Sequence, residues 1–164
     1  MRTRFAVALT TFVLVTTAAC GTDVPAGLAD KVKSGCPDLL KPEPLAVITK
    51  GFEVSEVSSS EANGCRVFVS TGRQVLNVGL VAYSSPAESE RLTPMLCRSG
   101  KLDANTKSCA DDEPGGGLTV RAAAGKWSVV VSVYEVPMND DVKKAAQQIV
   151  EDLGSSDKTR DQTP

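Results

Sequence analysis

The spacing of apolar residues divides the chain into stretches with a helical period and stretches with a strand period. An apolar residue recurs at every fourth position at Val24, Leu28 and Val32. This spacing predicts a short helix that ends at Gly35. Residues 36–44 contain three prolines and should form a constrained turn. For residues 45–51 the β-branched side chains are compatible with a strand, but the preceding prolines and the final glycine favour a short helix.

From Phe52 onward the period of the pattern becomes two, which is typical of half-buried β-strands. The predicted strands are residues 52–57, 65–70, 74–83, 118–124 and 127–136. Turns are expected at residues 58–64, which contain Asn-Gly, at 71–73, and at Gly125-Lys126. The strand at 74–83 is apolar at every second position, which indicates a central antiparallel strand with one buried face.

A helix start is well marked between the third and fourth predicted strands. Ser85 can cap the helix, Pro86 suits its first position, and Glu88 completes a capping box. Pro94 should end or kink this helix. Residues 97–117, which are polar and rich in glycine, are expected to form a long loop.

The last predicted helix follows a cap at Asn139 or Asp140 and ends at Gly154. Its apolar stripe consists of Val142, Ala145, Ala146, Ile149, Val150 and Leu153. Residues 155–164 lack large apolar side chains and should be disordered. Together these elements predict one two-layer α+β domain over residues 26–154, in which an antiparallel sheet of about five strands packs against two to three helices.

The N-terminal residues have the order of a secretory signal. Arg2 and Arg4 are basic, residues 5–15 are apolar apart from two threonines, and small residues directly precede Cys20. The apolar run is shorter than the roughly 20 residues that span a bilayer. We therefore predict a signal peptide over residues 1–19.

Small residues directly before Cys20 resemble the bacterial lipobox, whose cysteine receives diacylglycerol. The resemblance implies lipidation of Cys20, a tether over residues 20–25, and a place at the outer face of the cytoplasmic membrane. Thr17 stands where the lipobox usually has Leu, so a freely secreted protein is the alternative. The count of five cysteines favours the anchor, because acylation of one leaves an even number to pair.

The four remaining cysteines are Cys36, Cys65, Cys97 and Cys109. They allow three connectivities. We favour Cys36 with Cys65, which would tie the N-terminal helical segment to a strand, and Cys97 with Cys109, which would cross-link the polar loop. A metal site is the competing interpretation, but the chain has no histidine and no C-x2-C pair, so no metal is expected.

Two short motifs resemble the DUF3558 family, which consists of small actinobacterial lipoproteins of unknown function. These motifs are Gly35–Leu40 (GCPDLL) and Asn63–Phe68 (NGCRVF), and the resemblance runs from about Leu28 to Leu153. It implies the first disulfide and the α+β fold, and it implies no activity. The family often has an aromatic residue where this chain has Val67. A PsbP-like lipoprotein domain is the other α+β family that the pattern resembles.

Signatures of catalysis and of cofactor binding are missing from the sequence. Without histidine, Ser-His-Asp and Cys-His arrangements are impossible. The glycines at 115–117 lack the Gly-Lys-Ser/Thr of a phosphate loop, and Asp103–Asn105 lacks the glycine and the closing Glu of a calcium loop. We expect neither enzyme activity nor a cofactor.

Charge also limits the choice of partners. The formal net charge is −2, and removal of Arg2 and Arg4 with the leader brings the mature part near −4, so nucleic acid is not an expected partner. The sequence favours a non-catalytic binding or assembly module of the cell envelope, which would present a sheet edge or the loop at 97–117 to an unknown envelope protein. The alternative is a carrier of a small apolar ligand or lipid in a cavity between sheet and helices, beside Ala145 and Ala146.

Overall fold

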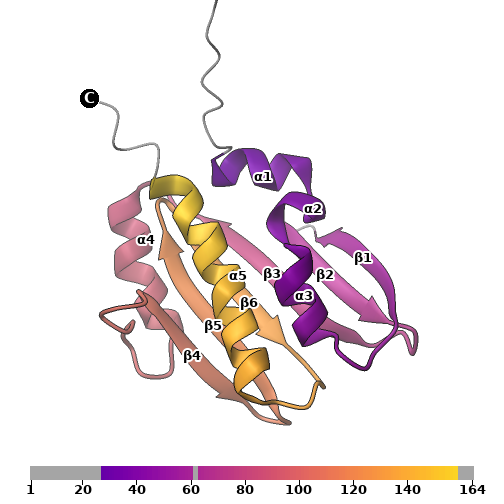
Figure 1. Cartoon of the computed structure of the whole chain (residues 1–164). Helices are drawn as coiled ribbons and strands as arrows, with labels where there is room; N and C mark the ends of the chain where they lie inside the picture. Colours follow the sequence, from indigo (N-terminus) through magenta and orange to yellow (C-terminus); the bar gives the residue numbers. More distant parts are fainter. Residues whose placement is uncertain (1–26, 61–62, 159–164) are drawn as a thin grey trace, which may run out of the picture.

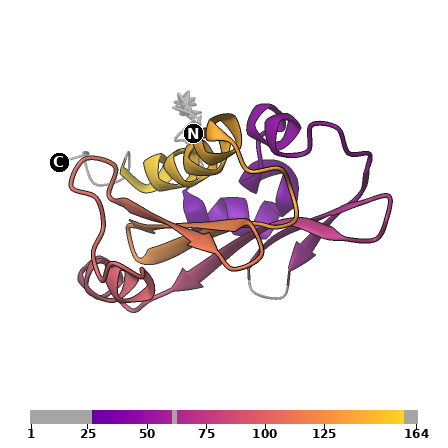
Figure 2. The same ribbon diagram turned by 90° about the horizontal axis from the view of Figure 1, so that it is seen from below.

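The computed structural model describes residues 27–60 and 63–158, which form an α+β domain with an antiparallel sheet (Figure 1). The helices are α1 (Leu28–Ser34), α2 (Cys36–Leu39), α3 (Pro42–Ile48), α4 (Pro86–Leu92), the 3-10 helix η1 (Thr93–Leu96) and α5 (Asp140–Lys158). The strands are β1 (Val54–Ser60), β2 (Gly64–Val69), β3 (Gln74–Ala82), β4 (Ser108–Glu113), β5 (Gly117–Ala124) and β6 (Trp127–Val133). The predicted α+β class with an antiparallel sheet is confirmed, but α4 lies on the sheet face opposite α5 (Figure 2), so the helices do not form a single layer.

The strands lie in the order β1-β2-β3-β6-β5-β4, and every neighbouring pair is antiparallel. The centre of the sheet is formed by β3 and β6, which pair continuously from Leu76 opposite Val133 to Ala82 opposite Trp127. Strands β1 and β4 are the two edges. The alternation seen in the sequence at 74–83 therefore belongs to a central strand, as expected.

One face of the sheet carries the hydrophobic core. Every second residue of β5 and β6, such as Val120 and Val131, points toward α5 and is almost fully buried. The stripe predicted on α5 supplies the other half of the core, with Ala146 and Ile149 at its centre. Figure 2 shows α3 and α5 on this face of the sheet and α4 on the opposite face.

Three expectations about local structure were wrong. The stretch at 97–117 is not one loop, because residues 108–113 form the edge strand β4 and raise the number of strands to six. Residues 36–44 contain α2 and the first turn of α3 rather than a turn alone. The prolines fit there because the first residues of a helix need no hydrogen-bonding N–H. Residues 58–60, expected in a turn, pair with β2 as the end of β1.

Helix α5 also continues past Gly154, where we expected it to end. A Cβ atom at this position would lie 3.9 Å from the Cβ of Ala124, so the glycine is part of the contact between α5 and β5. A single glycine inside a helix costs only about 1 kcal/mol, and the packing of the preceding turns compensates for it. Residues 155–158 are therefore helical, whereas residues 159–164 of the predicted disordered tail lie outside the described residues.

Candidate functional site

The disulfide framework matches the connectivity that we favoured. Cys36 is bonded to Cys65, with Cα atoms 5.4 Å apart, and this bond joins α2 to the start of β2. Cys97 is bonded to Cys109, with Cα atoms 6.1 Å apart, and this bond joins the end of η1 to the edge strand β4. Two such bonds fit an extracytoplasmic location, where thiols become oxidised.

The predicted lipidation site, Cys20, lies outside the described residues, as do the signal peptide and the tether that we expected around it. No helix within the described ranges is both long and apolar enough to span a bilayer. Lipidation of Cys20 stays a prediction.

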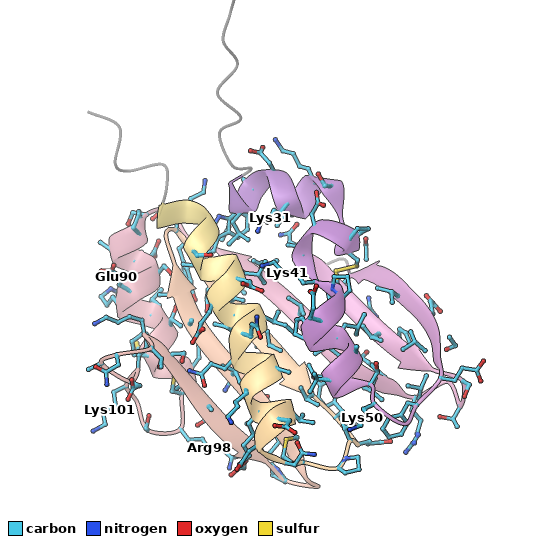
Figure 3. The ribbon with its side chains drawn as sticks, in the orientation of Figure 1. Lys31, Lys41, Lys50, Glu90, Arg98 and Lys101 are labelled. Atoms are coloured by element: carbon cyan, nitrogen blue, oxygen red, sulfur yellow. A yellow bond between two sulfur atoms is a disulfide. The ribbon has the colours of Figure 1, made fainter. Side chains whose placement is uncertain are left out.

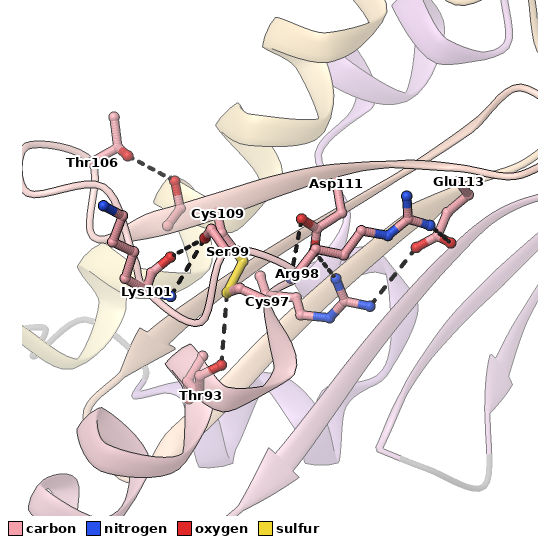
Figure 4. Close-up of a disulfide and its surroundings, with 11 residues drawn as sticks. Thr93, Cys97, Arg98, Ser99, Lys101, Thr106, Cys109, Asp111 and Glu113 are labelled. Atoms are coloured by element: carbon pink, nitrogen blue, oxygen red, sulfur yellow. Dashed lines mark hydrogen bonds and ion pairs between the residues drawn. A yellow bond between two sulfur atoms is a disulfide. The ribbon is translucent and has the colours of Figure 1, made fainter.

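A charge network surrounds the second disulfide (Figure 4). Alternation along β4 places Asp111 and Glu113 on the same face as Cys109, away from the core. The buried carboxylate of Asp111 accepts a hydrogen bond of 2.8 Å from the Arg121 guanidinium and bonds of 3.3 Å from the backbone N–H of Arg98. Arg98 in turn donates to Glu113 at 3.2 Å. The network therefore fixes the disulfide-bonded edge, and the carboxylates of Asp111 and Glu113 are both bound by arginines.

The acidic residues of β4 do not converge on one point. Asp112 points to the helix side of the sheet and lies 3.2 Å from the Lys143 ammonium, whereas Asp111 points to the opposite side. Within residues 27–60 and 63–158, no group of three or more His, Cys, Asp or Glu side chains could hold a metal ion.

Asp103 organises the turn that leads into β4. One of its carboxylate oxygens accepts hydrogen bonds from the backbone N–H groups of Thr106 and Asn105, at 3.0 and 2.9 Å. These bonds favour the charged form and hold the pKa of Asp103 below its ordinary value, the bond from Thr106 contributing most. The carboxylate is thus used to close a turn, which Lys107 completes with a φ of 53°.

Two hollows open on the surface of the domain. The first, which we call the α3–α5 groove, has a volume of about 520 Å³ and lies between these two helices. Its lining includes the apolar residues Val47, Ile48, Val142 and Ala145. Lys50 and Asp141 also line it and add charge. The groove differs from the expected cavity between sheet and helices: Ala145 lines it, but no strand residue does, and Ala146 is fully buried in the core.

The second hollow lies on the sheet face that α5 does not cover, beside the turn between β4 and β5. Its volume is about 560 Å³, and its lining is more polar than that of the groove. Thr119 and Ser132, both in the lining, bind one another through their hydroxyls at 3.2 Å, and Arg121 is held by Asp111. Its charged side chains are also paired, Glu113 with Arg98 and Glu135 with Arg73.

The fold and the site define a disulfide-bonded α+β domain with a charged, cross-linked sheet edge. Family models, curated proteins and solved structures were compared with the chain, and none matches it. Similarity to DUF3558 stays a prediction.

Sequence reasoning found the cysteine pairs but missed the strand between Cys97 and Gly117. A signal for it existed. Residues 108–113 stand directly before Pro114 and three glycines, and a strand follows, which is the arrangement of a hairpin with a longer turn. The three acidic residues made the stretch look like a solvated loop, because their counterions are distant in the sequence.

Proposed function

We propose that this protein is a lipid-anchored module on the outer face of the cytoplasmic membrane and that it binds or assembles with an envelope protein without catalysing a reaction. The observation that carries the anchor is the pairing of the cysteines. Of the five in the chain, four form two disulfides, so Cys20 is the cysteine that remains for acylation. Two or three acyl chains would hold the domain firmly at the bilayer, since each buried CH2 contributes about 0.8 kcal/mol.

The binding role is supported by the segment from Ser85 to Glu113. Within the described part of the chain, the hydrophobic core cluster includes no residue of this segment. Even so, the segment is fixed by a disulfide and by the network around Asp111. A well-fixed surface element that the core does not need is typical of a recognition surface.

The anchor is tested by replacing Cys20. The wild-type chain and a Cys20→Ala variant would be compared by detergent-phase partition and by intact mass, with and without reduction. We expect the wild type in the detergent phase with a mass increase for acyl groups, and the variant in the aqueous phase. Reduction should add the mass of four hydrogens to both, because both keep two disulfides. An unacylated, uncleaved wild-type chain would overturn the anchor.

The binding role is tested with exposed residues of the disulfide-bonded segment. Met95 is 71% exposed, and Lys101 points away from the domain (Figure 3). A Met95→Asp/Lys101→Glu variant should lose cross-linking to an envelope protein that the wild type captures. The control is Val57→Asp, at the opposite sheet edge, where Val57 is 43% exposed. Capture that is unaffected by the first variant, or no capture by the wild type, would overturn the proposed role.

A second candidate function, a carrier of a small apolar ligand, is favoured by the α3–α5 groove. Val47 lines this groove and is 38% exposed, so a charge there should repel an apolar ligand. Binding of a fluorescent fatty acid should weaken at least tenfold in Val47→Glu and stay unchanged in Val81→Glu. Val81 is 48% exposed and lies outside the groove lining. Equal binding by both variants would eliminate the groove as a carrier site.

A further inference from the structure

The segment that follows β3 is attached to the domain in an unusual way. We call α4 and η1, residues 86–96, the strap. It contacts β5 and β6 on the sheet face opposite α5 (Figure 2). Its fully buried side chains are Ser89 and Thr93, which carry hydroxyls, whereas Met95 and Leu96 are 71% and 47% exposed. The strap therefore contributes little apolar burial, the main source of stability for most helices on a sheet.

Polar and covalent links take the place of apolar packing. The hydroxyl of Ser89 donates a hydrogen bond of 2.7 Å to the backbone carbonyl of Trp127. At the C-terminal end of the strap, Cys97 is bonded to Cys109, and the neighbouring Arg98 backbone N–H donates to Asp111 (Figure 4). The strap is thus held at one point along its length and more firmly at its end.

The surface between strap and sheet is polar. The hydroxyls of Thr93 and Ser128 are buried there without a hydrogen-bonding partner among the described protein atoms. A buried hydroxyl without a partner is destabilising, and separation of strap and sheet would let water bind it. Opening would therefore expose hydroxyls rather than a large apolar surface, and it would relieve a desolvation cost.

The N-terminal end of the strap is capped by residues of its own segment. Ser85 accepts a hydrogen bond from the Glu88 N–H, and the Glu88 carboxylate accepts bonds from the backbone N–H and the hydroxyl of Ser84. These contacts cap α4 from within its own sequence, so separation from the sheet leaves them intact.

We propose that the strap opens from the sheet as a unit while the core stays folded, and that the Cys97–Cys109 bond limits this opening. Opening would uncover the face of β5 and β6 around Ser128. The second disulfide would then regulate access to this face, in addition to fixing the edge. This inference does not depend on acylation of Cys20.

Hydrogen exchange measured by mass spectrometry on the oxidised full chain tests the proposal. In the wild type, strap amides should exchange at least tenfold faster than those of α5 (residues 140–153). The double variant Cys97→Ala/Cys109→Ala should accelerate strap exchange by roughly tenfold to a hundredfold, from the loop-closure entropy that the bond removes, and strap amides should still exchange at least tenfold faster than those of α5. Ser89→Ala should accelerate the strap by roughly fivefold, from the loss of one hydrogen bond.

Two controls separate strap opening from general destabilisation. Ser99→Ala removes an exposed hydroxyl whose hydrogen bonds reach only the backbone of Lys101, beside the second disulfide, and should leave strap exchange unchanged. Cys36→Ala/Cys65→Ala removes the other disulfide and should accelerate α5 through global unfolding far more than the strap, which exchanges through its own local opening. If wild-type strap amides are as protected as α5, or if loss of Cys97–Cys109 leaves strap exchange unchanged, the strap does not open as a unit that this bond limits, and the proposal fails.

Discussion

Removal of the Asp111 carboxylate tests how much the charge network stabilises the disulfide-bonded edge. The Asp111 side chain is 8% exposed and the Arg121 side chain is 19% exposed. Loss of one partner from a buried ion pair costs about 3–5 kcal/mol, because the other charge stays buried without compensation. Here Glu113 remains 3.9 Å from Arg121, and the guanidinium keeps some contact with water. We therefore expect Asp111→Ala to lower the free energy of unfolding by about 2 kcal/mol.

Urea unfolding of the oxidised chain, followed by fluorescence, measures this change. Trp127 is the one tryptophan of the chain and is 8% exposed, so its emission should report loss of the core. A double-mutant cycle with Arg121→Met, which keeps the apolar stem of the side chain, should give a coupling energy of about 1 kcal/mol with Asp111→Ala. The control is Asp112→Ala, whose carboxylate is 74% exposed beside Lys143 and should contribute less than about 0.5 kcal/mol. If Asp111→Ala is no more destabilising than this control, the network is not a source of stability.

Three further predictions concern packing and pH. In Gly64→Ala the new Cβ would lie 1.8 Å from a backbone carbonyl oxygen of β3, so the free energy of unfolding should fall by about 3 kcal/mol. In the control Gly79→Ala the nearest atom is a side-chain amide nitrogen at 3.8 Å, and the loss should be about 1 kcal/mol or less. Urea unfolding measures both changes. Ile149→Ala, at a side chain 1% exposed on α5, should lower unfolding free energy by about 3 kcal/mol in the same assay, and a loss below about 1 kcal/mol would mean that α5 is not central to the core. The hydroxyl of Ser84, and then its backbone N–H, donate hydrogen bonds that lower the pKa of Glu88. The capping contribution of Glu88 is therefore complete above the ordinary Glu pKa and is lost as pH falls through the lower pKa of the folded state. NMR titration should find a lowered pKa for Glu88, and Ser84→Ala should raise that pKa.

The elements that the sequence predicted are those with local or periodic signals. The alternation in residues 74–82, the capping box at Ser85 and the apolar stripe on α5 each specify an element from its own residues, and each is present. The favoured disulfides came from the place of each cysteine, since one bond would tie the N-terminal helical segment to a strand and the other would cross-link the polar loop. Because these elements have local signals, their order along the chain was enough to predict the α+β class.

Strand β4 was harder to predict, because apart from the turn at Pro114 and the three glycines that follow it, the reasons for the strand lie elsewhere in the chain. Asp111 is tolerated in a nearly buried strand position since Arg121, on the neighbouring strand, neutralises it. The strand forms by pairing with β5, and its Cys109 is bonded to Cys97. These are tertiary contacts, and a polar stretch gives no local sign of them.

The order of the cysteine pairs has a consequence for biogenesis. Each disulfide joins two cysteines that follow one another along the chain, with no other cysteine between them. A polypeptide that crosses the membrane N-terminus first presents Cys36 and Cys65 to an oxidant before Cys97 and Cys109 appear. Sequential oxidation alone would then give native pairing, with no need for an isomerase to reshuffle bonds. A thioether on Cys20 would also prevent the first thiol of the chain from forming a wrong disulfide with Cys36.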